Sequence, residues 1–141
     1  MTKILISGGA GFIGANFVHY TLRNRPEYHL TVIDKLTYAA NPATLDSVRK
    51  QIEFVEGDIC DRELMDDLVS KTDIVVHFAA ESHNDNSLRD PWPFLQTNLI
   101  GTASILEAVR RHGVKLHHIS TDEVYGDLEL DDPAKFNPET P

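Results

Sequence analysis

The sequence predicts an α/β fold in which five parallel β-strands form one sheet with helices on both faces. Two observations lead to this prediction. Five short apolar runs alternate with segments of helical pattern along the chain. Each run is nearly continuous in apolar character, as expected for strands that are buried on both sides. With 141 residues, the chain is expected to form one compact domain.

The strands are predicted from these apolar runs, in chain order. The first run, KILIS, is followed by a glycine-rich stretch, and the second, HLTVID, ends in an acid. With the helical pattern between them, these two runs make a βαβ unit of about thirty residues. The predicted strands cover residues 3–7, 29–34, 52–57, 73–80 and 114–120.

The helices are predicted from apolar residues near helical spacing and from signals at the helix ends. Asn41 followed by Pro42 is typical of a helix start, and Asp61 can cap the next helix. Gly113 suits the left-handed residue that ends a helix. From Asp127 on, acids and prolines without any period predict a surface loop. The predicted helices cover residues 12–24, 42–50, 62–71 and about 93–112.

Composition limits the classes of function. The formal charge of −9 opposes binding to nucleic acid or to anionic membranes, and no apolar run reaches the length of a membrane-spanning helix. The first residues lack the pattern of a secretory signal, so a cytoplasmic location is expected. Cys60 is the single cysteine, and His83 with Asp85 has no third ligand nearby, so no metal site is expected. A small ligand is the better expectation.

The segment SGGAGFIG between the first strand and the first helix predicts a dinucleotide site. Gly8 would turn tightly, Gly11 would admit a diphosphate, and Gly14 would let the helix approach the strand. Asp34, twenty residues after Gly14, ends the second strand, where a carboxylate can accept both hydroxyls of an adenosine ribose. This favours NAD over NADP, although Lys35 beside it leaves NADP open. A simple glycine turn is the alternative.

Two further strand ends point to the same cofactor. After the third strand, Asp58 is positioned to bond the adenine amino group with Ile59 packing on the ring; a helix-capping turn is the alternative. After the fourth strand, Ala79 and Ala80 would let the backbone pass close to a ligand. With the strand order 3-2-1-4-5, the crevice opens between strands one and four at the carboxyl edge. The sheet is therefore predicted to be Rossmann-like.

The segment STDEVYG follows the fifth strand at the same edge. Thr121, Asp122 and Glu123 would make an ordinary turn, since such residues favour turns. If NAD binds beside them, these residues can instead be catalytic. Oxidation of a hydroxyl to a ketone acidifies the neighbouring C–H, so one carboxyl group can remove that proton while the other protonates a departing hydroxyl. The two pKa values must then differ, and the residues alone do not show which acid has which role.

Six segments together resemble one enzyme family. SGGAGFIG, DKLTYA, GDI, FAAESH, TNLIGT and STDEVYGDL, in this order, are similar to the extended short-chain dehydrogenases/reductases, and most of all to those that dehydrate nucleotide sugars. The match runs from Lys3 to about Leu128. It implies NAD as cofactor and dTDP-glucose as substrate: oxidation at C4, loss of water across C5 and C6, and return of hydride to C6.

The resemblance also implies roles for individual residues. Asp122 is the implied acid for the C6 hydroxyl, Glu123 the base for the C5 proton, and Thr121 a hydrogen-bond partner near C4. Ser82 is implied, with Thr121, to touch the substrate. The implied cofactor-binding residues are Gly8, Gly11, Phe12, Ile13, Gly14, Asp34, Lys35, Leu36, Thr37, Asp58, Ile59, Phe78, Ala79, Ala80, Glu81, Ser82 and Thr97.

The chain departs from the family pattern in two places. The family usually has arginine where this chain has Asn86, within NDNS at residues 84–87. The family's Tyr-x-x-x-Lys helix and substrate domain are expected shortly after Pro141. We therefore expect residues 1–128 to form the NAD-binding domain, residues 129–141 to be a loop leading toward that helix, and the chain to be truncated and inactive alone.

Other functions remain open from the sequence. A nucleotide-sugar epimerase or decarboxylase of the same family would share the glycine loop but generally has small or hydroxyl residues in place of Asp122 and Glu123. A non-catalytic dinucleotide-binding sensor would need the loop and Asp34 but gives no reason for the acid pair. The resemblance further implies a homodimer of the full-length protein through the helix over 93–112, whose apolar stripe is equally explained by core packing.

Overall fold

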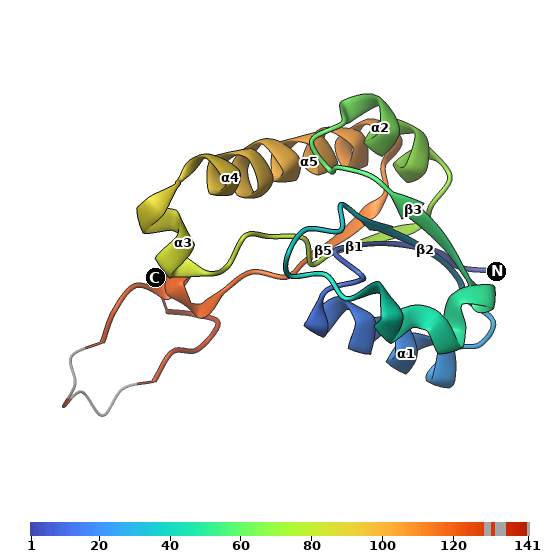
Figure 1. Cartoon of the computed structure of the whole chain (residues 1–141), viewed down its shortest axis with the longest axis horizontal. Coiled ribbons are helices and arrows are strands. Elements are labelled where there is room, and N and C mark those ends of the chain that lie inside the picture. Colours follow the sequence, from blue (N-terminus) through green and yellow to red (C-terminus); the bar gives the residue numbers. More distant parts are fainter. Residues whose placement is uncertain (129–130, 132–134, 141) are drawn as a thin grey trace.

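The fold was analysed in a computed structural model, which describes residues 1–128, 131 and 135–140. Five parallel strands form one sheet in the order β3-β2-β1-β4-β5. Helices lie on both faces, with α1 on one side and α2 and α5 on the other (Figure 1). The predicted fold class and strand order are confirmed. Of the predicted loop over 129–141, residues 129–130, 132–134 and 141 lie outside the described residues.

The elements follow the predicted segments closely. Asp61 caps α2 as predicted, because its side chain accepts hydrogen bonds from the backbone N–H groups of Glu63 and Leu64. Gly113 ends α5 with a left-handed φ of 66°. The strands are β1 Lys3–Ser7, β2 His29–Asp34, β3 Ile52–Glu56, β4 Ile74–His77 and β5 Lys115–His118. The helices that match are α1 Phe12–Asn24, α2 Arg62–Ser70 and α5 Thr102–His112.

Two apolar cores cover the two faces of the sheet. Because successive strand residues point to opposite sides, Ile4 and Ile6 of β1 join the core under α1, whereas Leu5 between them joins the core under α2 and α5. Val18 of α1 fills the first core, and Ile105 of α5 fills the second, each fully buried. The continuous apolar character of the strands is thus explained by burial on both sides.

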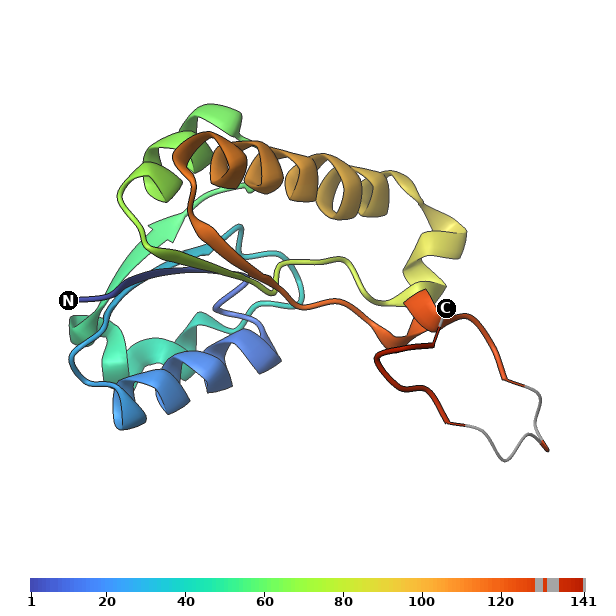
Figure 2. The ribbon, with the colours of Figure 1, turned by 180° about the vertical axis from the view of Figure 1, so that it is seen from behind.

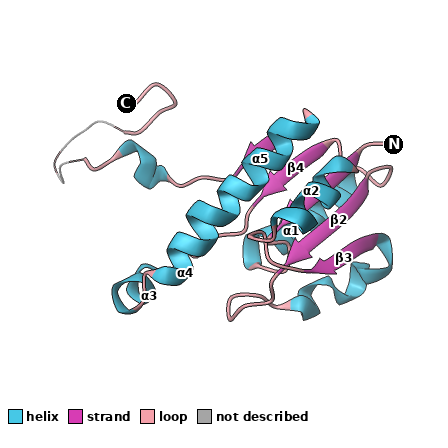
Figure 3. Cartoon of the chain, turned by 90° about the horizontal axis from the view of Figure 1, so that it is seen from above, coloured by secondary structure: helices cyan, strands magenta, loops and turns pink. Residues whose placement is uncertain are grey.

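The structure differs from the sequence prediction at two helices. The segment after Asn41 forms a 3₁₀ helix, η1 Pro42–Gln51, and the Asn41 side chain makes no capping hydrogen bond. The predicted helix over 93–112 is divided into α4 Trp92–Phe94, a π-helical stretch η2 Leu95–Gly101, and α5. Seen from above, α4 to α5 form a rod that runs across the sheet and past its edge (Figure 3). A short helix before it, α3 Asn84–Arg89, was not predicted.

The carboxyl ends of the strands share one edge, and the described segment that directly follows β5, residues 119–128, projects beyond that edge (Figure 2). All strand pairs are parallel, so the turns that follow β1, β2, β3, β4 and β5 meet there. In the part of the chain that the structure describes, every helix is too short or too polar to cross a lipid bilayer.

A buried polar cluster ties β1, β4 and α5 together just below this edge. His77 is 1% exposed, and its Nδ1 lies 2.7 Å from Oγ of Ser7 while its Nε2 lies 3.1 Å from Oγ1 of Thr102. Burial lowers the pKa of His77 to about 4, assisted by the neighbouring His118 ring. The neutral imidazole is therefore the form that stabilises the fold.

This arrangement predicts that the free energy of unfolding depends on pH through the protonation of His77. The unfolded chain binds a proton near the ordinary pKa of 6.5, whereas the folded chain resists protonation until about pH 4. Stability is therefore fully present above about pH 6.5 and is lost as the pH falls toward 4, by about 3 kcal/mol. Urea unfolding of the wild type and His77→Asn between pH 7.5 and 4 measures this loss, which should be missing from the variant.

The exposed His117 on β5 supplies the control. His117→Asn should keep the wild-type pH profile, because its side chain is not part of the buried cluster. Parallel profiles for the wild type and His77→Asn would contradict the prediction.

Candidate functional site

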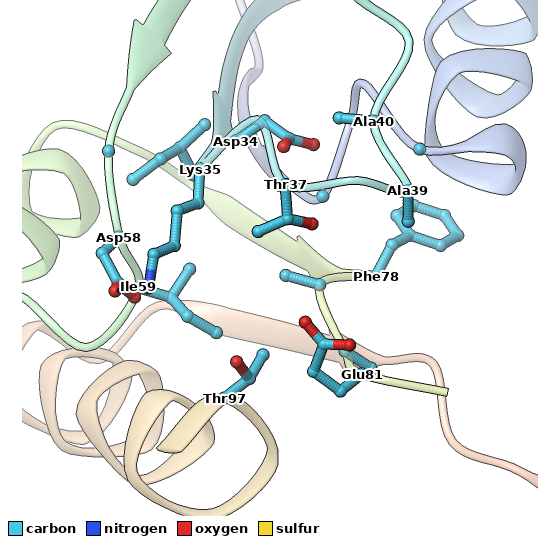
Figure 4. Close-up of a pocket in the computed structure, with 16 residues that line it drawn as sticks. Asp34, Lys35, Thr37, Ala39, Ala40, Asp58, Ile59, Phe78, Glu81 and Thr97 are labelled. Carbon is cyan, nitrogen blue, oxygen red and sulfur yellow. Dashed lines mark ion pairs between the residues drawn. The ribbon is translucent and has the colours of Figure 1, made fainter. Parts of the chain in front are cut away.

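A cavity opens at the carboxyl edge between the ends of β1, β2, β3 and β4. Its walls come from the turns after these four strands, and the π-helical stretch η2 adds Thr97 (Figure 4). It lies at the switch point of the sheet, where β1 has β2 on one side and β4 on the other. The lining residues are Gly8, Gly11, Ile33, Asp34, Lys35, Thr37, Ala39, Ala40, Gly57, Asp58, Ile59, Phe78, Ala79, Ala80, Glu81 and Thr97.

Glycine at positions 8 and 14 is required by the tight packing of the turn after β1. Gly8 has a φ of +69°, and a Cβ atom there would lie 2.6 Å from the backbone nitrogen of Ala79. A Cβ atom on Gly14 would overlap the carbonyl oxygen of Gly8. Only glycine lets the turn, α1 and the end of β4 approach this closely.

The start of α1 faces this turn with unpaired backbone donors. Gly11 is the N-cap residue and makes no side-chain capping bond, and the first turn holds no acidic residue. The first N–H groups of a helix have no intrahelical partner, so the helix start favours an anion. Phe12 and Ile13, which follow Gly11, are 84% and 63% exposed. This end of α1 is therefore open to a negatively charged ligand.

The carboxylate of Asp34 is held in place by two backbone N–H groups. Its Oδ2 accepts from Ala10 N at 2.9 Å, and its Oδ1 accepts from Leu36 N at 2.9 Å. Leu36 has a φ of 56°, a left-handed conformation that is uncommon for such a residue. This turn sends the Leu36 side chain toward the core under α1 and points Asp34 into the cavity.

An ion pair closes the side of the cavity between β2 and β3. Lys35 Nζ lies 2.6 Å from Oδ2 of Asp58 (Figure 4). The hydrogen bond with Asp58 raises the pKa of Lys35 despite partial burial. Burial alone would raise the pKa of Asp58, but the hydrogen bonds from Lys35 and from Cys60 N together hold it below its ordinary value. Both groups are thus charged at neutral pH.

A second bridge, in a hollow next to the cavity, joins the turn after β2 to the segment after β4. Tyr38 Oη donates to Oε2 of Glu81 at 3.0 Å, and Asn86 Nδ2 donates to Tyr38 Oη at 3.3 Å. The backbone of Glu81 is held in turn by Asn98 of η2, which accepts from its N–H and donates to its carbonyl oxygen, both at 2.9 Å. The segment after β4 is thereby fixed along the cavity.

A sequence model of the GDP-mannose 4,6 dehydratase family matches residues 5–141. The chain belongs to this family. It is 62% identical over 139 residues to a dTDP-glucose 4,6-dehydratase of Mycobacterium tuberculosis strain H37Rv. The alignment covers 99% of this chain and 42% of that protein. The predicted resemblance to the extended short-chain dehydrogenases/reductases is thus confirmed.

Solved structures of the family agree in fold. The dTDP-glucose 4,6-dehydratase of Bacillus anthracis, crystallised in complex with NAD, is 39% identical to this chain with a TM-score of 0.87. The match covers 100% of this chain and 44% of the Bacillus chain. DesIV of Streptomyces venezuelae, another dTDP-glucose 4,6-dehydratase, with NAD and TYD bound, is 39% identical with a TM-score of 0.89, covering 99% and 45%. The chain spans less than half the length of these dehydratases.

Most of the cofactor residues expected for a member of the dehydratase family line this one cavity. Twelve of them do so: Gly8, Gly11, Asp34, Lys35, Thr37, Asp58, Ile59, Phe78, Ala79, Ala80, Glu81 and Thr97. Five lie outside its lining. Phe12 and Ile13 are exposed at the start of α1, Gly14 is buried behind it, Leu36 packs on the core, and Ser82 is exposed just past Glu81. Their binding roles stay predictions.

Sequence reasoning missed Ala39 and Ala40, which line the cavity after β2. The signal was present, since two small residues after a strand end had already indicated close backbone approach at Ala79 and Ala80. The two alanine pairs border the same opening. Ala40 is fixed by the hydrogen bond from its N–H to the carbonyl oxygen of Thr37, at 3.0 Å.

The structure does not bring the acid pair into the cavity. Asp122 and Glu123 lie in a short 3₁₀ turn, η3 Asp122–Tyr125, whose first N–H groups are partly capped because Thr121 Oγ1 accepts from Glu123 N at 3.4 Å. All three side chains are exposed, and Tyr125 stacks on Phe136 with ring centroids 5.6 Å apart. The corner lies at the predicted carboxyl edge, after β5, and its catalytic role in a family dehydratase stays a prediction.

The close packing at the glycine turn predicts a loss of stability on substitution. Gly14→Ala should lower the free energy of unfolding by about 2 kcal/mol or more, because the added methyl group overlaps a backbone oxygen that cannot move without shifting β1. Chemical denaturation measures this change. Gly11→Ala is the matched control in the same turn, with 3.3 Å to the nearest atom, and should cost about 1 kcal/mol. Equal losses in the two variants would contradict this account.

Proposed function

We propose that this chain is the cofactor-binding part of an NAD-dependent dTDP-glucose 4,6-dehydratase. One observation carries the proposal: the glycine turn, the fixed carboxylate of Asp34 and the Asp58 side chain line a single cavity at the switch point of the sheet. The similarity to dTDP-glucose 4,6-dehydratases supports the substrate, and the two solved dehydratases that hold NAD support the cofactor.

The residues present fit NAD. The open start of α1 suits a diphosphate, and the Asp34 carboxylate, aimed into the cavity by two N–H groups, suits the paired hydroxyls of a ribose. Asp58 and Ile59 would contact adenine. When bound, NAD supplies the acceptor that takes hydride from the sugar C4 and returns it to C6, so the overall reaction removes only water.

The chain's own residues then manage the protons. The C4 ketone acidifies the C5–H, Glu123 removes that proton, and Asp122 protonates the C6 hydroxyl as it leaves as water. The protonated Glu123 then returns the proton to C5 when C6 is reduced. Thr121 would hydrogen-bond the substrate near C4, with Ser82 as a second contact. Separate pKa values for the two acids require different environments, which substrate and the remainder of a full-length dehydratase would supply.

A dinucleotide-binding sensor is the second candidate, and one observation favours it. The acid corner is exposed and lies outside the cavity, whereas the cavity alone suffices for a sensor. An epimerase would also need only the cavity and the sugar site. The presence of Asp122 and Glu123 in sequence favours the dehydratase over both.

The full-length protein is further proposed to form a homodimer through the outer face of the rod from α4 to α5. Ile105 points into the core, but Leu95, Leu99 and Leu106 are 41%, 61% and 50% exposed. Such a run of exposed apolar side chains is typical of an interface. A cytoplasmic location and the absence of nucleic-acid partners stay predictions.

The dimer has a direct test. Leu99→Glu places a charge in the proposed interface and should convert a dimer to a monomer in analytical ultracentrifugation of the full-length protein. Arg110→Ala, a change at an exposed residue of α5 in the same rod, should leave the dimer intact. A wild type that sediments as a monomer would contradict the proposal.

The dehydratase function is tested by replacing each acid in the full-length protein. With dTDP-glucose and NAD, Glu123→Gln should abolish exchange of the C5 proton with deuterium from solvent and lower 4-keto product formation by about 10²- to 10⁴-fold. Asp122→Asn should lower product formation by a similar factor.

Asp127→Asn is the control, since Asp127 is an exposed acid close by in the chain. It should keep wild-type turnover. A wild type that binds NAD but forms no 4-keto product would favour the sensor and overturn the dehydratase proposal.

A further inference from the structure

The charges that line the cavity are unbalanced toward the negative. Asp34, Asp58 and Glu81 contribute three carboxylates, and among the described lining residues Lys35 is the one cation. Asp34 is where the hydroxyls of an adenosine ribose would be held. A dinucleotide with an additional 2′-phosphate would bring further negative charge to that place, so its binding depends on whether a cation can reach it.

Lys35 follows Asp34 directly and is the residue best placed to meet a 2′-phosphate. A basic side chain near this acid is what accommodates that phosphate in dinucleotide-binding folds. In this structure, however, the Lys35 ammonium extends across to the turn after β3 and lies 2.6 Å from Asp58 Oδ2 (Figure 4). The Lys35 ammonium is therefore paired with a carboxylate of the protein itself, Asp58, which follows a neighbouring strand.

Asp58 is well placed to keep this partner. Its other oxygen, Oδ1, accepts from Cys60 N at 2.9 Å, which fixes the carboxylate. The Asp58 side chain is one-third exposed, whereas that of Lys35 is 58% exposed, so the carboxylate is the anchored member and the lysine the movable one. Removal of the Asp58 charge would free Lys35 to turn toward its neighbour Asp34.

We infer that the Lys35–Asp58 ion pair is a specificity-determining element, which selects NAD over NADP by holding the one lining cation away from the 2′ position of the ribose. The inference rests on the proposed function, since it assumes that the cavity holds the adenosine half of NAD. Two features would then disfavour the 2′-phosphate. Asp34 repels it directly, and Asp58 keeps the Lys35 ammonium from offsetting that repulsion.

The test compares two probes that differ only in the 2′-phosphate, 5′-AMP and 2′,5′-ADP, by calorimetry on the full-length protein. Asp58→Asn keeps an oxygen for Cys60 N but removes the partner charge of Lys35. The affinity ratio of 2′,5′-ADP to 5′-AMP should rise about tenfold or more, the worth of one charge-assisted hydrogen bond to phosphate. A weaker adenine contact in the variant affects both probes and cancels in the ratio.

A double variant separates the lysine from the simple loss of a negative charge. In Asp58→Asn with Lys35→Met, the rise should disappear, because no cation remains to meet the phosphate. Asp67→Asn is the matched control: it breaks a surface pair with Lys71 of the same 2.6 Å length, outside the cavity, and should leave the ratio unchanged. Thermal melting of each variant confirms that it is folded.

Three outcomes overturn the inference. An unchanged ratio in Asp58→Asn shows that Lys35 is not held back, and a rise that survives in the double variant shows that the lysine is not the cause. The third, a wild type that binds neither NAD nor 5′-AMP, overturns the proposed function as well. Because wild-type binding of NAD is measured first, failure of the ion-pair inference alone is distinguishable from failure of the whole site.

Discussion

The close approach of two backbone segments is the constraint on which the site depends. At the end of β1 the chain turns so tightly that Gly8 lies against the backbone of Ala79, and α1 begins so near that Gly14 lies against Gly8. Side chains at these positions would force the segments apart. The start of α1 would then move away from the cavity that Gly8 and Gly11 line, together with the backbone N–H groups that are proposed to meet an anion.

Polar groups buried beneath the turn maintain this approach. Ser7 Oγ contacts His77 and also accepts, at 3.4 Å, from Ala79 N, so the last residue of β1 holds the segment after β4 by a side chain as well as by sheet pairing. On the other side, Asp34 accepts from Ala10 N and thereby links β2 to the same turn. Hydrogen bonds within the protein thus hold the walls of the site in place.

The sequence predicted the sheet well because burial on both faces imposes a pattern that is readable residue by residue. The ends of β1, β2 and α1 were predicted to the residue, and Asp61 and Gly113 behaved as their types suggest.

What could not be predicted depends on tertiary contacts. The π-helical stretch, which the sequence did not predict, presents Thr97 to the cavity and Asn98 to the backbone of Glu81. Similarly, the inward turn of Leu36 follows from a hydrogen bond to Asp34, and the partner of Lys35 lies on another strand.

The charge distribution explains how a chain of negative net charge can still have a site that suits an anionic ligand. Near the cavity, the described side chains offer three carboxylates against one lysine, and that lysine is paired with Asp58. Side-chain cations are therefore not what would hold a diphosphate here. Backbone N–H groups at the start of α1 carry partial positive charge without a side chain, and they act at short range only if the chain comes very close. The need for glycine in the turn and the carboxylate of Asp34 in the cavity thus fit one proposed arrangement, in which the backbone would meet the phosphates and Asp34 would meet the ribose hydroxyl groups.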